Sequence, residues 1–284
     1  MMIVPLYGAQ TPEQQANAFL KTPENCRKII FATNIAETSL TVANIGYVLD
    51  CGLVKQKVYN PETGMESLVV VPISKVQAIQ RTGRAGRTRE GKCIRLYSEK
   101  FFKEQMPDMT VPEIKRVNLA STVLTLKNIG INDVINFDYL DTPDLLSLQL
   151  ALKQLYQLRA INKKGELEAL GFELCKFPLE PTYAKALLAS YYLDCEKEMI
   201  SLVSVLSSEN VWLTVSRRKE EDQLRLEECK KRFANQTDMK SDHMLLVKLY
   251  EEWVSQRSRE NEWCYRNNVQ SRALRQARSI SGQL

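Results

Sequence analysis

The 284-residue sequence has a single histidine, His243, and no apolar run near the roughly 18 residues that a membrane-spanning helix needs. Polar and turn-forming residues interrupt its first ten positions, which argues against a signal peptide. The seven cysteines are odd in number and lack the paired spacing of a zinc site, so we expect reduced core thiols in the nucleus or cytosol and no metal ligands. His243 has no partner nearby for acid–base work and is interpreted as a helix-start or packing residue. A secreted, membrane or zinc protein is therefore not indicated.

A phosphate-binding loop of the form Gly-x-x-x-x-Gly-Lys-Ser/Thr is also absent. The nearest run, Gly91-Lys92-Cys93, lacks both the first glycine and the hydroxyl that would reach magnesium. A net charge of +5 is only a mild bias toward nucleic acid. Any nucleotide chemistry must therefore come from another kind of motif.

Such a motif is present at Gln80-Arg81-Thr82-Gly83-Arg84-Ala85-Gly86-Arg87, where three arginines stand at three-residue steps. A guanidinium is a planar, permanently charged fork that matches phosphate oxygens. Gly83 and Gly86 allow the backbone to turn sharply and to approach a ligand closely. A solvated basic turn is the alternative, but it would not need the glycines. The run favours polyphosphate binding.

Two short apolar strands precede this run, at Lys28–Ala32 and Tyr47–Asp50, and we expect them to be neighbours in one sheet. The first ends in a polar segment that runs from Thr33 to Thr41. Parallel α/β sheets bind ligands at such strand ends, where hydroxyls and amides can contact phosphate oxygens. Capping of a following helix by Thr38 or Ser39 is the alternative.

Hydrophobic periodicity predicts α/β structure up to about residue 107, including a helix over Pro12–Leu20. Two prolines in the run 107–112 indicate a boundary. Helices at Val117–Lys127 and Leu145–Leu158 and a small hairpin over 160–170 follow, as in a winged-helix domain. Beyond Pro178 the pattern is almost wholly helical, with helices expected at Tyr183–Asp194, Glu196–Leu206, Arg217–Phe233, His243–Arg257 and Asn268–Ile280.

The motifs together resemble those of the DEAH-box RNA helicases of superfamily two. Residues 32–42, ATNIAETSLTV, resemble motif V, and residues 80–87 resemble motif VI. Residues 58–74 resemble the β-hairpin of that family, and the similarity continues to the end of the chain. It implies an α/β RecA-like second lobe with a parallel sheet and a β-hairpin insertion at residues 1–108. A winged-helix domain at 109–177 and an all-α, ratchet-like helical bundle at 178–284 are expected to follow.

The resemblance also assigns roles around ATP and Mg²⁺. In relatives, the glutamine of motif VI positions the attacking water and its second and third arginines contact the phosphates, which here are Gln80, Arg84 and Arg87. Arg81 is interpreted as structural. Phe19 matches a phenylalanine that stacks on adenine, although a core aromatic on an amphipathic helix remains the alternative. The magnesium ligands are expected in a first lobe, which this sequence lacks together with any Asp-Glu-Ala-His run.

Motif V couples RNA to the nucleotide in relatives. The resemblance implies RNA-backbone contacts for Thr33 and Asn34, and coupling roles for Ser39 on the RNA side and Thr41 on the nucleotide side. Relatives carry an aspartate that contacts the ribose two residues after the last threonine of motif V. This chain has Ala43 there, so we expect nucleotide affinity to depend more on phosphate contacts and stacking.

A basic stripe is expected on the last helix, where Arg272, Arg275 and Arg278 stand at three-residue steps. Cations with interleaved aromatic residues commonly hold single-stranded RNA. A solvated basic face is the alternative for these arginines. Trp253 and Trp263 are predicted to be core anchors.

These features predict the C-terminal portion of an ATP-dependent 3′-to-5′ RNA helicase that remodels ribonucleoprotein such as the splicing machinery. Nuclear or cytoplasmic localisation is expected, with no membrane association. Without the first lobe, the chain alone is expected to be inactive as an ATPase. The competing hypothesis is a non-catalytic module that binds RNA or a G-patch activator, since G-patch proteins dock on the winged-helix and second lobes of relatives.

Overall fold

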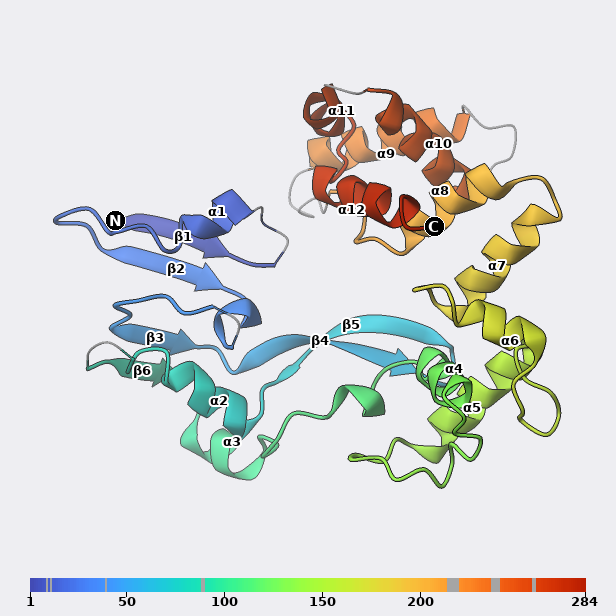
Figure 1. Ribbon diagram of the computed structural model, residues 1–284. Coiled ribbons are helices and arrows are strands. Elements are labelled where there is room, and N and C mark those ends of the chain that lie inside the picture. Colours follow the sequence, from blue (N-terminus) through green and yellow to red (C-terminus); the bar gives the residue numbers. More distant parts are fainter. Residues whose placement is uncertain are drawn as a thin grey trace. The chain divides into compact units, whose positions relative to one another are not determined.

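The computed structural model describes residues 1–8, 10, 12–38, 40–87, 90–213, 220–235, 241–256 and 259–284 (Figure 1). The chain forms two compact units. Unit 1 comprises residues 1–119 and 135–150, and unit 2 comprises residues 120–134 and 151–284.

The strands of unit 1 form three separate ladders. β1 (Met2–Leu6) pairs in parallel with β2 (Lys28–Ala32), and β3 (Tyr47–Asp50) pairs in parallel with β6 (Lys92–Arg95). β4 (Leu53–Asn60) and β5 (Met65–Pro72) form the expected antiparallel hairpin. Both strands expected from the sequence are present, but within the described residues no ladder joins β2 to β3, so their direct pairing was wrong. An apolar run specifies that a strand forms, whereas its partner depends on the whole sheet.

Short helices lie between and after these strands along the chain. They are α1 (Pro12–Ala16), η1 (Asn34–Ala36), α2 (Lys75–Thr82), α3 (Glu99–Glu104) and η2 (Glu113–Lys115). α1 ends four residues earlier than expected and is followed by turns. One apolar cluster centres on Val4, Leu6 and Ala18, and a second centres on Ile73, Ala78 and Met106.

Unit 2 is helical, with α4 (Ala120–Asn128), the end of α5 (Leu145–Gln157), α6 (Ala169–Leu174), α7 (Pro181–Tyr191), α8 (Glu196–Leu206), α9 (Glu220–Asn235), α10 (Asp242–Ser255), α11 (Glu260–Arg266) and α12 (Ser271–Ser281). The helices expected from periodicity are present, and the short helices α6 and α11 were not expected. A single antiparallel bridge, Ile161 to Leu167, closes the expected small hairpin. The winged-helix assignment and the three domain boundaries stay predictions.

The core of unit 2 gathers around large aromatic side chains. Trp253 and Phe233 are fully buried, and Trp263 is nearly so, which confirms the core role expected for the two tryptophans. Cysteines behave less uniformly, because Cys264 is buried whereas Cys26 and Cys51 are exposed. The expectation of core thiols was therefore wrong for the latter two, which follow a turn and a strand end respectively.

Within the described part of the chain, no helix is long and apolar enough to cross a membrane. The same residues contain no group of three or more His, Cys, Asp or Glu side chains arranged to hold a metal ion.

Candidate nucleotide and RNA site

Helix α2 presents motif VI. A capping box starts it: Ser74 Oγ accepts from the Gln77 backbone N–H at 3.2 Å, and Gln77 Oε1 accepts from the Ser74 N–H at 3.0 Å. The helix ends at Thr82 and the chain turns at once, so the residues that follow leave the helix axis. Gln80 lies on the last turn of α2 and its side chain is exposed, as the proposed role of orienting a water would require.

Arg81 ties three segments of unit 1 together. Its Nε donates to Glu37 Oε2 at 3.0 Å, and its Nη1 donates to Asp50 Oδ1 at 2.8 Å. Burial lowers the pKa of the Arg81 guanidinium, but the hydrogen bonds and charges of Asp50 and Glu37 outweigh it and raise the pKa above its ordinary value. This agrees with a structural role, and it joins the motif V loop to the end of β3 and to α2.

Asp50 accepts two further hydrogen bonds, from the Tyr97 hydroxyl at 3.0 Å and from the Gly52 N–H at 3.0 Å. Burial, followed by the hydrogen bond to Asp50, raises the pKa of Tyr97 to about 12. Sequence reasoning missed Glu37 and Asp50 as the partners of Arg81. An acidic residue ending an apolar strand, as Asp50 does, was the available signal.

Arg84 has an unsatisfied guanidinium. Its Nη1 is buried without a hydrogen-bond partner in the described structure, and its Nε makes only a long 3.5 Å contact with the Gln80 carbonyl. Burial, followed by repulsion from Arg87, lowers the pKa of Arg84. A buried unpaired N–H is costly, and an anionic oxygen would both satisfy it and offset the repulsion. The local chemistry therefore fits a phosphate.

Arg87 connects the two motifs, because its Nη1 donates to Thr41 Oγ1. The sequence assigned both residues to the nucleotide, and the structure brings them together although they lie 46 positions apart. Both are exposed, so each remains accessible to a ligand.

The remaining motif V residues lie at the exit of β2. Thr33 precedes η1 without a side-chain capping bond, and both Thr33 and Asn34 are exposed. Ser39 lies outside the described residues. The described residues 40–46, which follow Thr38, contain no helix, so the alternative that Thr38 caps a following helix was wrong.

Phe19 lies in the turns that follow α1, and its side chain is exposed. The alternative of a core aromatic on a helix is therefore not what the structure has. The ring is accessible for stacking on a planar ligand.

Gly91 supports motif VI, a role that was not expected from the sequence. A Cβ added there would lie 2.0 Å from the Ala85 carbonyl oxygen. Any side chain at this position would displace the backbone between Arg84 and Arg87. The glycine therefore keeps motif VI in place.

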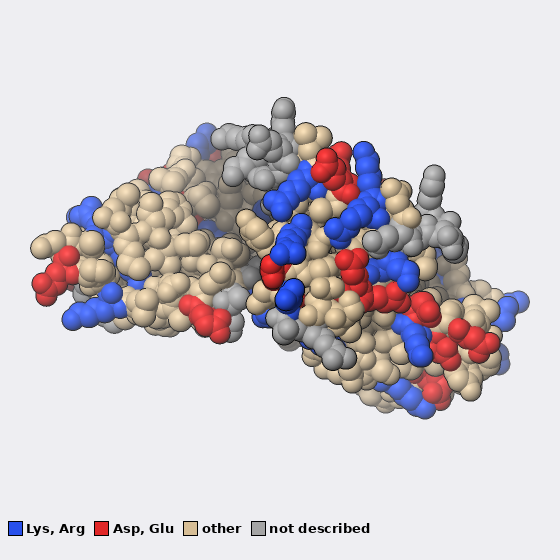
Figure 2. All heavy atoms as spheres, turned by 90° about the horizontal axis from the view of Figure 1, so that it is seen from above, with Lys and Arg blue, Asp and Glu red and all other residues tan. Residues whose placement is uncertain are grey.

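The three arginines of α12 all have partners within unit 2. Arg278 pairs with Glu260 at 2.7 Å and stacks over the Trp253 ring at 4.1 Å, and Arg272 lies 3.8 Å from Glu209. Arg275 instead donates to the neutral amide oxygen of Asn261 at 2.7 Å. On the face in Figure 2, acidic and basic side chains are interspersed rather than separated. Of the three, Arg275 is the one whose hydrogen bond in the described structure is to a neutral amide and not to a carboxylate.

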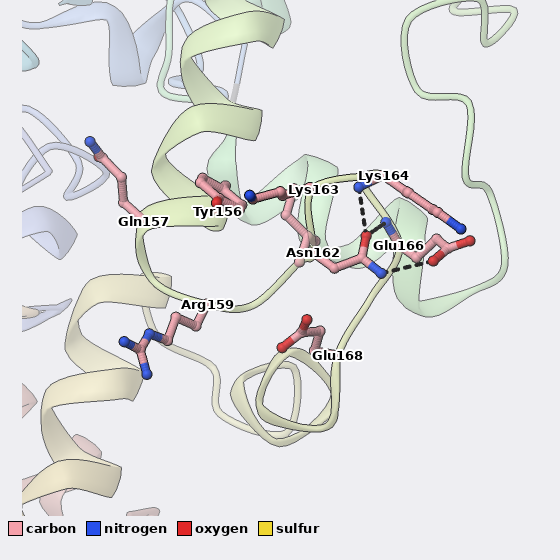
Figure 3. Close-up of a pocket in the computed structure, with 9 residues that line it drawn as sticks. Tyr156, Gln157, Arg159, Asn162, Lys163, Lys164, Glu166 and Glu168 are labelled. Atoms are coloured by element: carbon pink, nitrogen blue, oxygen red, sulfur yellow. Dashed lines mark hydrogen bonds between the residues drawn. The ribbon is translucent and has the colours of Figure 1, made fainter.

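A pocket of about 630 Å³ lies in unit 2, between the end of α5 and the hairpin (Figure 3). Asn162 shapes its rim: its Oδ1 accepts from the Lys164 and Glu166 N–H groups, and its Nδ2 donates to Glu166 at 2.8 Å. None of the site residues expected from the sequence lines this pocket.

Comparison with known proteins agrees with the two motifs. Residues 1–89 match the helicase conserved C-terminal domain, and residues 180–246 match the ratchet-like helicase associated domain, HA2. The whole chain is 43% identical to the pre-mRNA-splicing factor ATP-dependent RNA helicase prp22 of Schizosaccharomyces pombe. The chain belongs to the DEAH-box RNA helicases. It corresponds to a C-terminal portion of such a helicase, with a RecA-like lobe and a ratchet-like helical domain. It spans 24% of the length of that curated DEAH-box relative.

Proposed function

We propose that this chain is the C-terminal part of an ATP-dependent RNA helicase that couples nucleotide hydrolysis to translocation along RNA or remodelling of ribonucleoprotein. The relative that it matches throughout is named as a pre-mRNA-splicing helicase, which favours splicing as the process and the nucleus as the location. Its partners would be single-stranded RNA, spliceosomal ribonucleoprotein and a G-patch activator.

The observation that carries the nucleotide part of the proposal is the buried, unpartnered Nη1 of Arg84 beside Arg87. In phosphoryl transfer, catalysis is mostly positioning and charge stabilisation, and arginines stabilise the charge that develops on the transferred phosphoryl group. Arg84 and Arg87 would contact the phosphates of ATP, and Gln80 would orient the attacking water. Bound Mg²⁺ would neutralise phosphate charge, held by ligands of the first lobe.

Two further residues complete the nucleotide side. Phe19 would stack on the adenine, which its exposed ring supports. Thr41 would report nucleotide state to the motif V loop, because the Arg87 guanidinium already bonds its hydroxyl. A phosphate that draws Arg87 away would release Thr41, so hydrolysis would alter the loop that carries Thr33 and Asn34.

The RNA side would consist of Thr33, Asn34 and Ser39 in unit 1, and of the α12 arginines in unit 2. Thr33 and Asn34 are exposed, and the Thr33 side chain makes no capping hydrogen bond, which supports contacts of both with the RNA backbone. Among the arginines, the contacts favour Arg275 for phosphate binding and favour Arg278 for packing.

The nucleotide assignment can be tested in a chimera in which this chain replaces the matching segment of the fission yeast prp22. Arg84→Ala and Arg87→Ala should each lower RNA-stimulated ATPase by about a thousandfold or more, as loss of an arginine finger does. Arg27→Ala removes an equally charged, exposed side chain of unit 1 that lies outside motifs V and VI, and it should leave turnover unchanged. Near-normal ATPase in the Arg87→Ala chimera would overturn the assignment of motif VI.

The 284-residue chain alone should show no RNA-stimulated ATPase, because the phosphate-cradling loop and the magnesium ligands are not among its residues. Turnover above a buffer blank that Arg87→Ala abolishes would contradict this and favour a self-sufficient enzyme.

The RNA assignment can be tested by fluorescence anisotropy with several single-stranded RNAs across a salt series. Arg275→Ala should weaken all of them by a similar factor and reduce the salt slope by about 0.7, the value for one phosphate contact on single strands. Unchanged affinity for every RNA would return α12 to the solvated-face interpretation.

A further inference from the structure

Phe19 lies on a segment of turns whose backbone is held on both sides of the ring. Its own N–H donates to the Ala16 carbonyl at 2.9 Å, as the chain leaves α1. The Lys28 ammonium donates to the carbonyl of Ala18 at 2.6 Å and to the carbonyl of Leu20 at 2.7 Å. These two carbonyls belong to the residues directly before and after Phe19, so one ammonium group holds the backbone on either side of the ring.

Lys28 is itself fixed by the first ladder. It begins β2, where it is the register partner of Met2 on β1, and the Met2 N–H donates to the Arg27 carbonyl at 2.8 Å at this end of the ladder. The Lys28 side chain is half-buried, and burial lowers the pKa of its ammonium. Thr33 follows the other end of β2, so the group that holds the Phe19 segment and the motif V loop are attached to one strand.

Core packing anchors the residue before the ring but not the ring itself. Ala18 is fully buried, in the apolar cluster with Val4 and Leu6. The side chains of Phe19 and Leu20 are instead 46% and 55% exposed. A ring that is nearly half exposed takes its direction largely from the backbone that carries it. For a stacking residue that direction matters, because a ring that must first be ordered weakens binding by the cost of ordering it.

We propose that Lys28 is a positioning residue for the nucleotide base: by holding the carbonyls on either side of Phe19, it keeps the ring in the orientation in which it stacks. This inference rests on the proposed stacking of Phe19, and it adds a residue that acts on the base through that ring. Capping of the turns after α1 is the plain structural alternative, because a lysine near the end of a helix can bond its last carbonyls. The two roles differ in what a variant changes. A cap alone affects the stability of unit 1, whereas a positioning residue affects the affinity for the base.

Hydrogen–deuterium exchange of the 284-residue chain tests the hold on the backbone without any nucleotide. Lys28→Met keeps most of the apolar stem but removes the donors, and it should speed exchange of the amides at 18–21 by at least about threefold, with little change in β1 and β6. Lys21→Met removes an exposed lysine of the same segment and should leave these amides unchanged. Unchanged exchange at 18–21 in Lys28→Met would overturn the proposal. Equally faster exchange throughout β1, β2 and β6 would show a general loss of the fold and would overturn it too.

The chimera with the fission yeast prp22 tests the effect on the base, through RNA-stimulated hydrolysis of ATP and of UTP. Lys28→Met should raise KM for ATP by about threefold or more and leave kcat within about twofold, because base stacking is binding common to the ground state and the transition state. UTP has a smaller base to stack, so its KM should rise less and the ratio of KM for UTP to KM for ATP should fall. Lys21→Met should leave both KM values unchanged. A fall in kcat for both nucleotides with an unchanged KM ratio would support the cap alone and overturn the proposal.

Phe19→Ala in the same chimera separates this inference from the stacking on which it rests. It should raise KM for ATP by about fivefold or more and lower the same KM ratio, as loss of a stacked base contact does. Adding Lys28→Met to Phe19→Ala should change KM no further, because a positioning residue has no effect once the ring is gone. A KM ratio that Phe19→Ala leaves unchanged would overturn the stacking, and this inference with it. A ratio changed by Phe19→Ala but not by Lys28→Met, or a further rise of KM in the double variant, would overturn this inference alone.

Discussion

Replacing Arg81 with methionine should destabilise unit 1 severely. The side chains of Arg81, Glu37 and Asp50 are 15%, 6% and 0% exposed, so both ion pairs are largely shielded from water. Methionine keeps much of the apolar stem but leaves two carboxylates buried without their cation. Removing one partner of a buried pair costs about 3–5 kcal/mol, which is a large part of the roughly 5–15 kcal/mol that stabilises a domain.

Cys93 and the tryptophans lie in different units, so they show whether the loss of stability is confined to unit 1. Cys93 lies half-buried on β6, and mass spectrometry can follow its thiol labelling through a urea titration. All three tryptophans lie in unit 2, so tryptophan fluorescence follows that unit. With a denaturant slope of about 1–3 kcal/mol per molar urea, the Cys93 midpoint should fall by at least about 1 M. The tryptophan midpoint should change much less.

Two comparisons decide whether the buried charges are the cause. Arg27→Met alters an exposed arginine of the same unit and should leave the Cys93 midpoint in place. Adding Glu37→Gln and Asp50→Asn to Arg81→Met should recover at least about half of the loss, because no uncompensated charge then remains buried. An Arg81→Met midpoint equal to that of Arg27→Met would refute the reasoning.

Three further changes have defined outcomes. Gly52→Ala should lower the free energy of unfolding by more than the about 1–2 kcal/mol that an alanine with positive φ costs, because its Cβ would lie 2.6 Å from the Tyr97 ring. Gly64 has a similar φ but open space around it, so Gly64→Ala should cost only about 1–2 kcal/mol in urea unfolding. Because the pKa of Tyr97 is raised, the neutral hydroxyl stabilises the folded state below about pH 10, the ordinary tyrosine value, and this stability is lost as the pH rises toward 12. Urea unfolding across this pH range should show the loss, and the Tyr97→Phe variant should not show this pH dependence. Arg278→Ala should destabilise unit 2 by about 1–2 kcal/mol through its lost ion pair and stacking on Trp253, whereas Arg275→Ala should change tryptophan-monitored stability by less than about 0.5 kcal/mol.

Local patterns determined most of the element types in this protein. Strand periodicity located β2 and β3, and apolar spacing located helices such as α5 and α8 within a few residues. α11 was missed because its seven residues, with acidic side chains in the first turn, contain too little apolar periodicity to stand out. The arginine and glycine spacing of residues 80–87 by itself predicts phosphate binding, because that chemistry is local, whereas the roles of individual residues in motifs V and VI come from the resemblance to the helicases and stay predictions.

Only the tertiary structure decided which distant groups meet. Arg81 finds Glu37 and Asp50, and Arg87 finds Thr41, across 31 to 46 positions of sequence. The same holds for the α12 arginines, whose even spacing predicted one equivalent basic stripe. Their neighbours instead gave Arg278 a carboxylate and an aromatic ring, and gave Arg275 a neutral amide. A side chain's type and spacing are local, whereas its burial, charge compensation and strand partner depend on segments that only folding brings together.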